Sequence, residues 1–246
     1  MLNTVHYDGP NATPLLIAHG LFGSARNWNV IAKRLSTTRP VVVVDMRNHG
    51  ASSWFDTHSY SELADDLAEV VDKPMDVLGH SMGGKASMVL ALKYPSKVNR
   101  LVVADIAPVA YSHTQMGPLE AMRGVDMSVV NSRSDALLQL GGLQDGVAEF
   151  LLQSLDMKGK RWKLNLDVLA AEMDKIIGFP EVSGTFDGPT LFLSGANSDY
   201  VQHAHRNTIR ALFPQSHFAK ISGAGHWLHA EKPREFEASV AAFCAV

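Results

Sequence analysis

The most constraining feature of this chain is the pentapeptide Gly-His-Ser-Met-Gly at residues 79–83. An apolar run, residues 75–78, precedes it, and a good helix-forming stretch, residues 83–94, follows it and stops at Pro95. A G-x-S-x-G sequence between a strand and a helix forms a strained turn that holds a serine hydroxyl above the end of a sheet. Small flanking residues are needed because strand and helix approach closely there. The context favours Ser81 as a nucleophile over a serine in an ordinary glycine-rich turn.

A serine hydroxyl is a weak nucleophile until a base takes its proton, and an acid must orient that base. Enzymes with such a turn carry the acid and then the histidine later in the chain. The histidines that lie far enough beyond Ser81 are His203, His205, His217, His226 and His229. His226 stands between glycine and tryptophan, just after the apolar segment 218–221 that we expect to be the last strand. We therefore predict His226 as the base, with His203 and His205 solvated and His229 beside the site or on the surface.

Two aspartates compete for the role of the acid. Asp105 closes the expected strand 100–105, whereas Asp199 follows the expected strand 190–195 in a loop. In enzymes with such a turn, the acid more commonly lies three residues after the glycine that ends this strand, here Gly195. That position is Ser198, so Asp199 comes one place too late. Either aspartate can also act as a helix or loop cap. We predict Asp105 as the acid and keep Asp199 as the alternative, since orienting an imidazole demands close geometry.

Acyl transfer also needs an oxyanion hole, in which backbone N–H groups stabilise the negative charge that develops on the carbonyl oxygen. One donor is expected from Met82, the residue after the nucleophile. The other comes from the loop after an early strand. Here the expected strand 15–18 runs into a His-Gly turn at residues 19–20. We predict the Leu21 N–H as the second donor, with Phe22 as the alternative.

Composition limits the classes of function. At 246 residues and 46% hydrophobic, the chain can bury one large core with a small lid. A net charge of −3 gives no electrostatic case for nucleic acid or an anionic membrane. The single Cys244 excludes an internal disulfide, and no secretory signal or membrane-length apolar run is evident. We expect a cytoplasmic enzyme with a small-molecule substrate and no nucleic-acid or membrane partner; the composition leaves the oligomeric state open.

Strand-like and helix-like segments alternate along most of the chain, which predicts a mostly parallel central sheet flanked by helices. The expected strands lie at residues 15–18, 41–45, 75–78 and 100–105, and the expected helices between them at 28–35, 60–71 and 83–94. In such sheets, sites lie at the carboxyl ends of the strands. We predict a core formed by residues 1–106 and 189–246.

The alternation breaks between the two parts of this core, where residues 107–188 contain helix-like segments at 134–140, 147–155 and 166–177. An insertion after a mid-sheet strand predicts a small helical cap that folds over the site and excludes water. The cap residues considered for contact with substrate are Met116, Met122, Phe150, Leu151 and Trp162. Of these we keep Trp162 as a predicted substrate-binding residue, together with Phe22 and Trp227, although apolar residues at helical spacing are more often core.

Two further features lie near the expected site. Residues 47–50, Arg-Asn-His-Gly, follow a strand that ends at Asp45, and we interpret their polar groups as satisfying the backbone of a tight loop rather than lining the site. Trp227 is next to the predicted base, and we expect it to pack beside the imidazole and limit its motion.

Taken together, several motifs resemble one family. They are His-Gly at 19–20, Asp-Met-Arg-Asn-His-Gly at 45–50, Gly-His-Ser-Met-Gly-Gly-Lys at 79–85, Asp-Ile-Ala-Pro-Val at 105–109 and Gly-His-Trp at 225–227. The chain resembles, over essentially its whole length, the α/β-hydrolase fold esterases of the YbfF type, which are related to mitochondrial abhydrolase-domain proteins. The resemblance implies a carboxylic ester or thioester hydrolase with a small helical cap inserted after the strand that ends at Asp105, no cofactor and no metal. It also implies that Asp105 is the acid, that the residue matching Asp199 need not be acidic, and that short acyl chains are accepted.

The predicted mechanism is attack by Ser81 on an ester carbonyl, through a covalent acyl-enzyme, with His226 as base. Three other functions remain open on this scaffold: C–C bond hydrolysis, cofactor-free peroxidase chemistry, and a small-molecule receptor that turns over slowly. An intact set of predicted catalytic residues favours the enzyme over the receptor.

Overall fold

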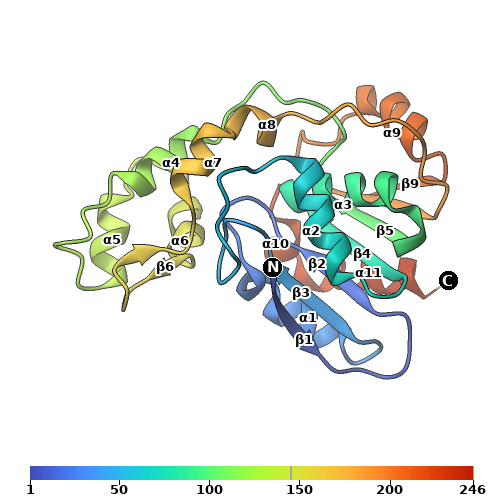
Figure 1. Cartoon of the computed structure of the whole chain (residues 1–246), viewed down its shortest axis with the longest axis horizontal. Helices are drawn as coiled ribbons and strands as arrows, with labels where there is room; N and C mark the ends of the chain where they lie inside the picture. Colours follow the sequence, from blue (N-terminus) through green and yellow to red (C-terminus); the bar gives the residue numbers. More distant parts are fainter. Residues whose placement is uncertain (145, 246) are drawn as a thin grey trace.

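A seven-stranded sheet forms the centre of the protein in the computed structural model, which describes residues 1–144 and 146–245 (Figure 1). The strands lie in the order β1-β3-β2-β4-β5-β8-β9, and all neighbours are parallel except β1 and β3. Their bounds are β1 (Asn3–Tyr7), β2 (Leu15–Ala18), β3 (Val41–Asp45), β4 (Met75–His80), β5 (Val98–Ala104), β8 (Thr190–Gly195) and β9 (Ser216–Ile221). The predicted mostly parallel sheet is confirmed, while the antiparallel edge strand β1 was not expected.

Helices cover both faces of this sheet. One face packs against α2 (Tyr60–Val70), α3 (Met82–Lys93) and α9 (Arg206–Leu212). The other packs against α1 (Asn29–Leu35) and α11 (Pro233–Cys244), with the short α10 (Leu228–Glu231) beside them. Three short 3-10 helices complete this part: η1 (Ala25–Trp28), η2 (Pro95–Lys97) and η3 (His203–His205).

The two apolar clusters explain why the parallel strands read as unbroken hydrophobic runs. In β3, Val42 and Val44 belong to the cluster under α2 and α3, whereas Val41 and Val43 belong to the cluster under α1 and α11. Successive side chains of a strand point to opposite faces, so a strand covered on both sides needs apolar residues at every position. This burial on both faces fixes the strands, and with them the edge at which they all end.

The segment between β5 and β8 forms a separate lobe beside the sheet (Figure 1). It has its own apolar cluster, which includes Leu119, Leu151, Trp162 and Leu169 and reaches Phe22 of the core. The elements of the lobe are α4 (Met116–Arg123), α5 (Arg133–Gln139), α6 (Val147–Leu152), β6 (Leu155–Asp156), β7 (Arg161–Trp162), α7 (Leu166–Ala171) and α8 (Met173–Ile177).

Three details of this lobe differ from the expectation. Helix α4 and the hairpin of β6 and β7 were not predicted, and the single helix expected at residues 166–177 is divided at Glu172 into α7 and α8. We keep 107–188 as the proposed extent of the cap. Residue 145 in that range, and residue 246 at the end of the expected core, lie outside the described residues.

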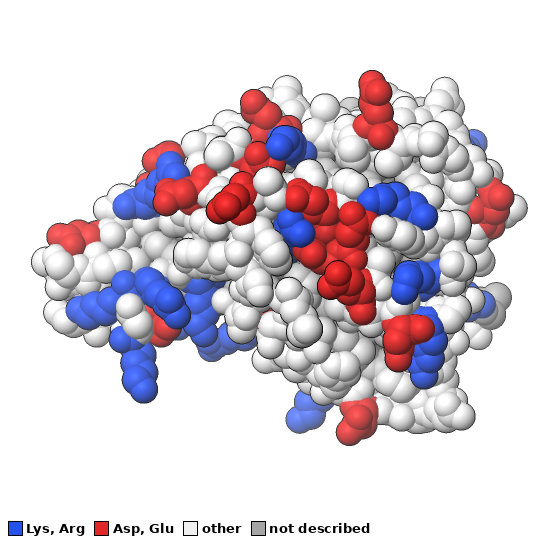
Figure 2. All heavy atoms as spheres, viewed as in Figure 1, with Lys and Arg blue, Asp and Glu red and all other residues white. Residues whose placement is uncertain are grey.

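Acidic side chains gather over α2 on the face shown in Figure 2. They are partly neutralised, because Asp66 pairs with Arg47 at 2.6 Å and Asp65 pairs with Lys93 at 2.6 Å. Among the described helices, none combines the length and the apolar character that crossing a membrane requires.

Candidate active site

Ser81 stands at the junction of β4 and α3 with φ 52° and ψ −120°. This backbone conformation is sparsely populated for a residue with a side chain. The flanking glycines are required by space: a Cβ on Gly79 would lie 2.2 Å from the Gly83 carbonyl oxygen, and one on Gly83 would lie 2.4 Å from the Ala18 carbonyl oxygen. The predicted strained turn between strand and helix is therefore confirmed.

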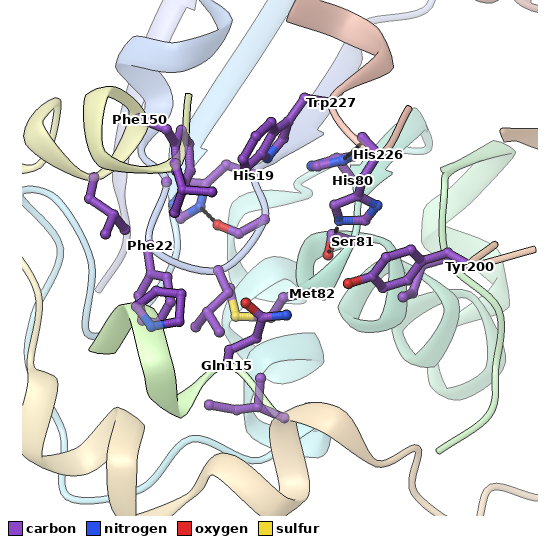
Figure 3. Close-up of a pocket in the computed structure, with 18 of the residues that line it drawn as sticks. His19, Phe22, His80, Ser81, Met82, Gln115, Phe150, Tyr200, His226 and Trp227 are labelled. Atoms are coloured by element: carbon purple, nitrogen blue, oxygen red, sulfur yellow. Dashed lines mark hydrogen bonds between the residues drawn. The ribbon is translucent and has the colours of Figure 1, made fainter. Parts of the chain in front are cut away.

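Three of the predicted residues form one hydrogen-bonded row. The Ser81 hydroxyl lies 3.1 Å from Nε2 of His226, and Nδ1 of His226 lies 2.8 Å from Oδ2 of Asp105 (Figure 3 shows the first contact). These distances suit a hydroxyl donor, a neutral imidazole that accepts from it, and a carboxylate that accepts the other imidazole proton. The row is able to move a proton from Ser81 onto His226 while Asp105 holds the ring.

The Asp105 carboxylate is fully buried and has several donors around it. Besides His226, the Gly195 N–H donates to its Oδ1 at 3.0 Å, and the Ser198 hydroxyl donates to its Oδ2. A buried charge is tolerated only when it is hydrogen-bonded in this way. Asp199 lines the same cavity but makes no hydrogen bond with His226 among the described contacts. The structure thus brings Asp105, and not Asp199, to the imidazole.

Backbone strain is concentrated around these residues. Phe22 has φ 63° and Asp105 has φ 52°, so with Ser81 they make three of the five described non-glycine residues at positive φ. Positions like these cost free energy and persist where the surroundings hold them in place, which is typical of functional sites.

The residues whose amides are predicted for the oxyanion hole, Leu21 and Met82, both line the cavity. Among the described residues, the N–H groups of Leu21 and Met82 have no acceptor in the protein, and both residues line the cavity next to Ser81. The alternative donor is occupied, because the Phe22 N–H donates to Nε2 of His49 at 3.2 Å. A turn holds the loop in shape, with the Gly23 N–H donating to the Gly20 carbonyl at 3.0 Å.

Two buried histidines, His19 and His49, make hydrogen bonds that hold the loop of residues 19–23 in position. His49 donates from Nδ1 to the Arg47 carbonyl at 2.8 Å, which leaves Nε2 as the acceptor for Phe22. His19 likewise accepts the Met46 N–H at 2.9 Å. Burial lowers the pKa of His49 well below its usual value, and it also lowers the pKa of His19, so both rings are neutral acceptors near pH 7. The interpretation of residues 47–50 as a structural loop is confirmed.

The ring that packs on the predicted base is not the expected one. Tyr200, in the loop after β8, stacks on His226 with ring centroids 4.0 Å apart and an angle of 19° between the planes. Trp227 instead packs against Phe150 of the lobe, at 5.6 Å between centroids. The expectation that Trp227 packs beside the imidazole is therefore wrong. The Trp227 ring packs toward the lobe, and the ring of Tyr200, from a different loop, stacks on the imidazole instead.

A second residue that sequence reasoning missed supports the backbone of His226. His80, just before the nucleophile, donates from Nε2 to the His226 carbonyl at 2.9 Å. Burial lowers the pKa of His80 well below its usual value, so it remains a neutral ring. Its position directly before Ser81 was the available signal.

A cavity of about 790 Å³ opens over Ser81, between the sheet edge and the lobe (Figure 3). The predicted Phe22 and Trp227 line it, and so do Phe150 and Leu151 of α6. Its wall combines these apolar groups with the polar residues around Ser81, as is usual for a small-molecule site.

The predicted Trp162 lies elsewhere. It is buried in the apolar cluster of the lobe, where its Nε1–H donates to the Met122 carbonyl at 2.8 Å, and it does not line the cavity. Met116 and Met122 do not line the cavity either. These side chains form the core of the lobe, as apolar residues at helical spacing usually do.

Within residues 1–144 and 146–245, no group of three or more histidine, cysteine, aspartate or glutamate side chains is arranged to hold a metal ion.

Comparisons with known proteins show what this chain is similar to. The model of the Alpha/beta hydrolase family matches residues 15–239. The chain is 42% identical over 255 residues to the sn-1-specific diacylglycerol lipase ABHD11 of Mus musculus, covering 97% of this chain and 83% of that protein. It is 37% identical over 230 residues to the esterase YbfF of Escherichia coli strain K12, covering 91% of this chain and 89% of that protein.

A solved structure named marine microorganism esterase is similar throughout. It superimposes with a TM-score of 0.93 at 35% identity and covers 98% of both chains. Relatives named as esterases and lipases over nearly the whole length confirm the expectation of an enzyme that hydrolyses carboxylic esters. The chain belongs to the alpha/beta hydrolase family.

Proposed function

We propose that this protein cleaves carboxylic esters of short acyl chains through a Ser81-His226-Asp105 triad and a covalent acyl-enzyme. The observation that carries the proposal is the hydrogen-bonded row of the three side chains, at 3.1 Å and 2.8 Å, beneath a cavity large enough for a small ester. The names of the relatives support the ester as the bond that is cleaved.

In the first half of the reaction, the Ser81 oxygen attacks the ester carbonyl carbon while Nε2 of His226 takes the hydroxyl proton. The tetrahedral intermediate collapses when His226 gives that proton to the leaving alcohol, which leaves the acyl group on Ser81. In the second half, Nε2 of His226 takes a proton from water as the water oxygen attacks the acyl carbon. The second tetrahedral intermediate collapses as His226 gives that proton to the Ser81 oxygen, which releases the carboxylic acid and regenerates the serine hydroxyl. The imidazole is thus base and acid in turn.

Asp105 acts through the imidazole and not on the substrate. It accepts the Nδ1 proton of His226, which keeps Nε2 free to face Ser81 and stabilises the imidazolium that forms in each half-reaction. The donors from Gly195 and Ser198 hold the Asp105 carboxylate in position.

The Leu21 and Met82 amides are the proposed oxyanion hole. Both lack a protein acceptor among the described residues and both line the cavity beside Ser81, so they are available for an oxyanion. Preorganised donors of this kind are worth about 3–4 kcal/mol of transition-state stabilisation each.

The proposed cap, residues 107–188, supplies the roof of the cavity. Phe150 and Leu151 of α6 face the site from the lobe, and Phe22 and Trp227 face it from the core. We propose Phe22 and Trp227 as substrate-binding residues, since both are apolar and line the cavity that opens over Ser81. The apolar wall favours a hydrocarbon acyl group, and an acyl thioester is the second substrate class to test.

The test is hydrolysis of p-nitrophenyl esters from acetate to palmitate, and of acyl-CoA thioesters, by the wild type and by Ser81→Ala. Ser96→Ala is the matched control, because Ser96 is exposed in η2 away from the cavity. The proposal expects activity that is highest on short esters, is lost in Ser81→Ala and is retained in Ser96→Ala. A folded wild type with no activity on any of these substrates would contradict it.

A further inference from the structure

Lys85 is a buried cation in the wall of the same cavity. It lies one turn of α3 after Ser81, and its backbone N–H donates to the Ser81 carbonyl at 3.0 Å. The residue is 1% exposed and lines the cavity. Among the described residues, its ammonium is paired with no carboxylate; it donates instead to the carbonyl oxygens of Ile177, at 2.9 Å, and Gly178, at 2.5 Å.

These two carbonyls are the end of α8, where the lobe returns to the core. The last carbonyls of a helix have no partner within it and carry its negative end, which a cation stabilises. Two further donors from the core reach the same point: the Tyr60 hydroxyl donates to the Ile176 carbonyl at 2.6 Å, and the Tyr111 N–H donates to the Ile177 carbonyl at 3.0 Å. Donors from α2, from α3 and from the segment after β5 thus converge on one turn of the lobe.

The same turn forms a wall of the cavity. Ile176 and Ile177 line it, next to Lys85 and Tyr60, and Met82 connects this part of the wall to the nucleophile. The position of the end of α8 relative to α3 therefore decides how far the cavity extends from Ser81 on this side.

We propose that Lys85 is a specificity-determining residue, which limits the length of the substrate group accepted on this side of Ser81 by holding the end of α8 against α2 and α3. This role rests on the proposed ester hydrolysis at Ser81. It explains why an ammonium that has no carboxylate partner among the described residues is kept buried in the cavity wall, where a methionine of similar length would cost less to bury.

The charge on Lys85 gives the proposal a second readout. Burial lowers the pKa of Lys85 to about 7. The rings that face the ammonium are Tyr111, at 4.8 Å, and Tyr60, at 5.7 Å, and burial raises the pKa of both, so they stay neutral between pH 6 and pH 9. On α8 itself, Asp174 and Lys175 are exposed. A charged donor bonds a carbonyl more strongly than a neutral one. The hydrogen bonds from Lys85 to the end of α8 therefore weaken as pH rises through 7 and the ammonium loses its proton.

The experiment compares kcat/KM for p-nitrophenyl octanoate with kcat/KM for p-nitrophenyl acetate in the wild type and in Lys85→Met. The ratio cancels the titration of the triad, which both esters share. Lys93→Met is the matched control, since Lys93 lies on the same helix but pairs with Asp65 outside the cavity. The octanoate-to-acetate ratio is expected to rise about tenfold or more in Lys85→Met and to stay at the wild-type value in Lys93→Met.

Two further measurements keep the proposal testable if Lys85→Met does not fold. Tyr60→Phe removes one donor to α8 and keeps the ring, so it should raise the ratio about threefold. In the wild type, the ratio should rise about threefold between pH 6 and pH 9. An unchanged ratio in folded variants, or an equal loss on both esters, would overturn the proposal for Lys85 alone. A wild type without Ser81-dependent hydrolysis of either ester would overturn the proposed function as well.

Discussion

Asp105 and His226 meet at 2.8 Å although β8 lies between the strands that precede them. The contact is possible because β8 ends in Gly195. A Cβ there would lie 2.2 Å from the carbonyl oxygen of Gly225, so the loop that carries His226 crosses directly over the end of β8. The Gly195 N–H also donates to Asp105, so one residue without a side chain serves both partners.

The assignment of the acid can be tested by two matched substitutions. Asp105→Asn leaves the shape of the side chain but presents the wrong hydrogen-bonding group to Nδ1 of His226, so kcat should fall by about 10³- to 10⁴-fold. Asp199→Asn should change kcat by less than about threefold, since Asp199 makes no hydrogen bond with the imidazole. Steady-state hydrolysis of a p-nitrophenyl ester decides the matter, and the opposite pattern would make Asp199 the acid.

Gly195→Ala should move Asp105 and His226 apart although neither of them is substituted. The added methyl group meets backbone atoms of Ala224 and Gly225, which cannot move away as a side chain would. We expect kcat to fall by about 10²-fold, because displacing a catalytic group by about 1 Å has effects of that size. Gly117→Ala is the control, as nothing lies within 4 Å of its added Cβ. Equal kcat in both variants would show that the loop carrying His226 has room for a methyl group at Gly195.

His49 should influence turnover although it does not touch the proposed oxyanion. His49→Phe removes the acceptor for the Phe22 N–H, so the loop that presents the Leu21 amide loses a support. We expect kcat to fall about tenfold with KM changed less than about threefold, since the oxyanion forms only in the transition state. A rise in KM at constant kcat would assign His49 to ground-state binding instead.

Buried neutral histidines should make the fold sensitive to acid. Burial lowers the pKa of His58 and of His229 to about 3, against a usual value near 6.5 in the unfolded chain. Between these values the unfolded chain binds more protons, so the free energy of unfolding falls as pH falls below 6.5. His229→Phe should reduce this slope by about 1.4 kcal/mol per pH unit, the contribution of one proton.

Urea unfolding between pH 4.5 and pH 7.5 measures that slope. His229 suits the test because its Nδ1 has no hydrogen-bond partner within the described part of the chain and its ring stacks on Trp28. His217→Gln is the control, since His217 is exposed on β9. Identical slopes for the wild type and His229→Phe would show that His229 does not stay neutral in the folded protein.

The features that depend on local sequence were predictable. The turn at Ser81 needs glycines at fixed positions next to the serine, and strands that are buried on both faces need apolar residues at every position. Both requirements produce patterns that can be recognised in the sequence. Asp105 was recognisable because it closes such a strand, at the edge where parallel strands end together. Strand β1 was not predicted because none of its five residues is buried and three of them, Asn3, Thr4 and His6, are polar.

Contacts between distant segments that no motif marks were not predictable. Tyr200 stacks on His226 from another loop, and Lys85 reaches carbonyls 92 and 93 residues away. Trp162 was placed at the substrate because it is large and apolar, yet it fills the core of the lobe. Nothing in the period or composition of a segment distinguishes these uses, since they follow from how the lobe packs on the sheet.

The most direct test of the central claim is to locate the acyl-accepting atom by covalent trapping. Diethyl p-nitrophenyl phosphate phosphorylates a serine that an adjacent histidine activates, and mass spectrometry of peptides identifies the modified residue. The account predicts one diethylphosphoryl group per chain, on Ser81, with none in Ser81→Ala or His226→Ala. A label on another residue, or an unlabelled Ser81 in protein that still hydrolyses esters, would contradict it.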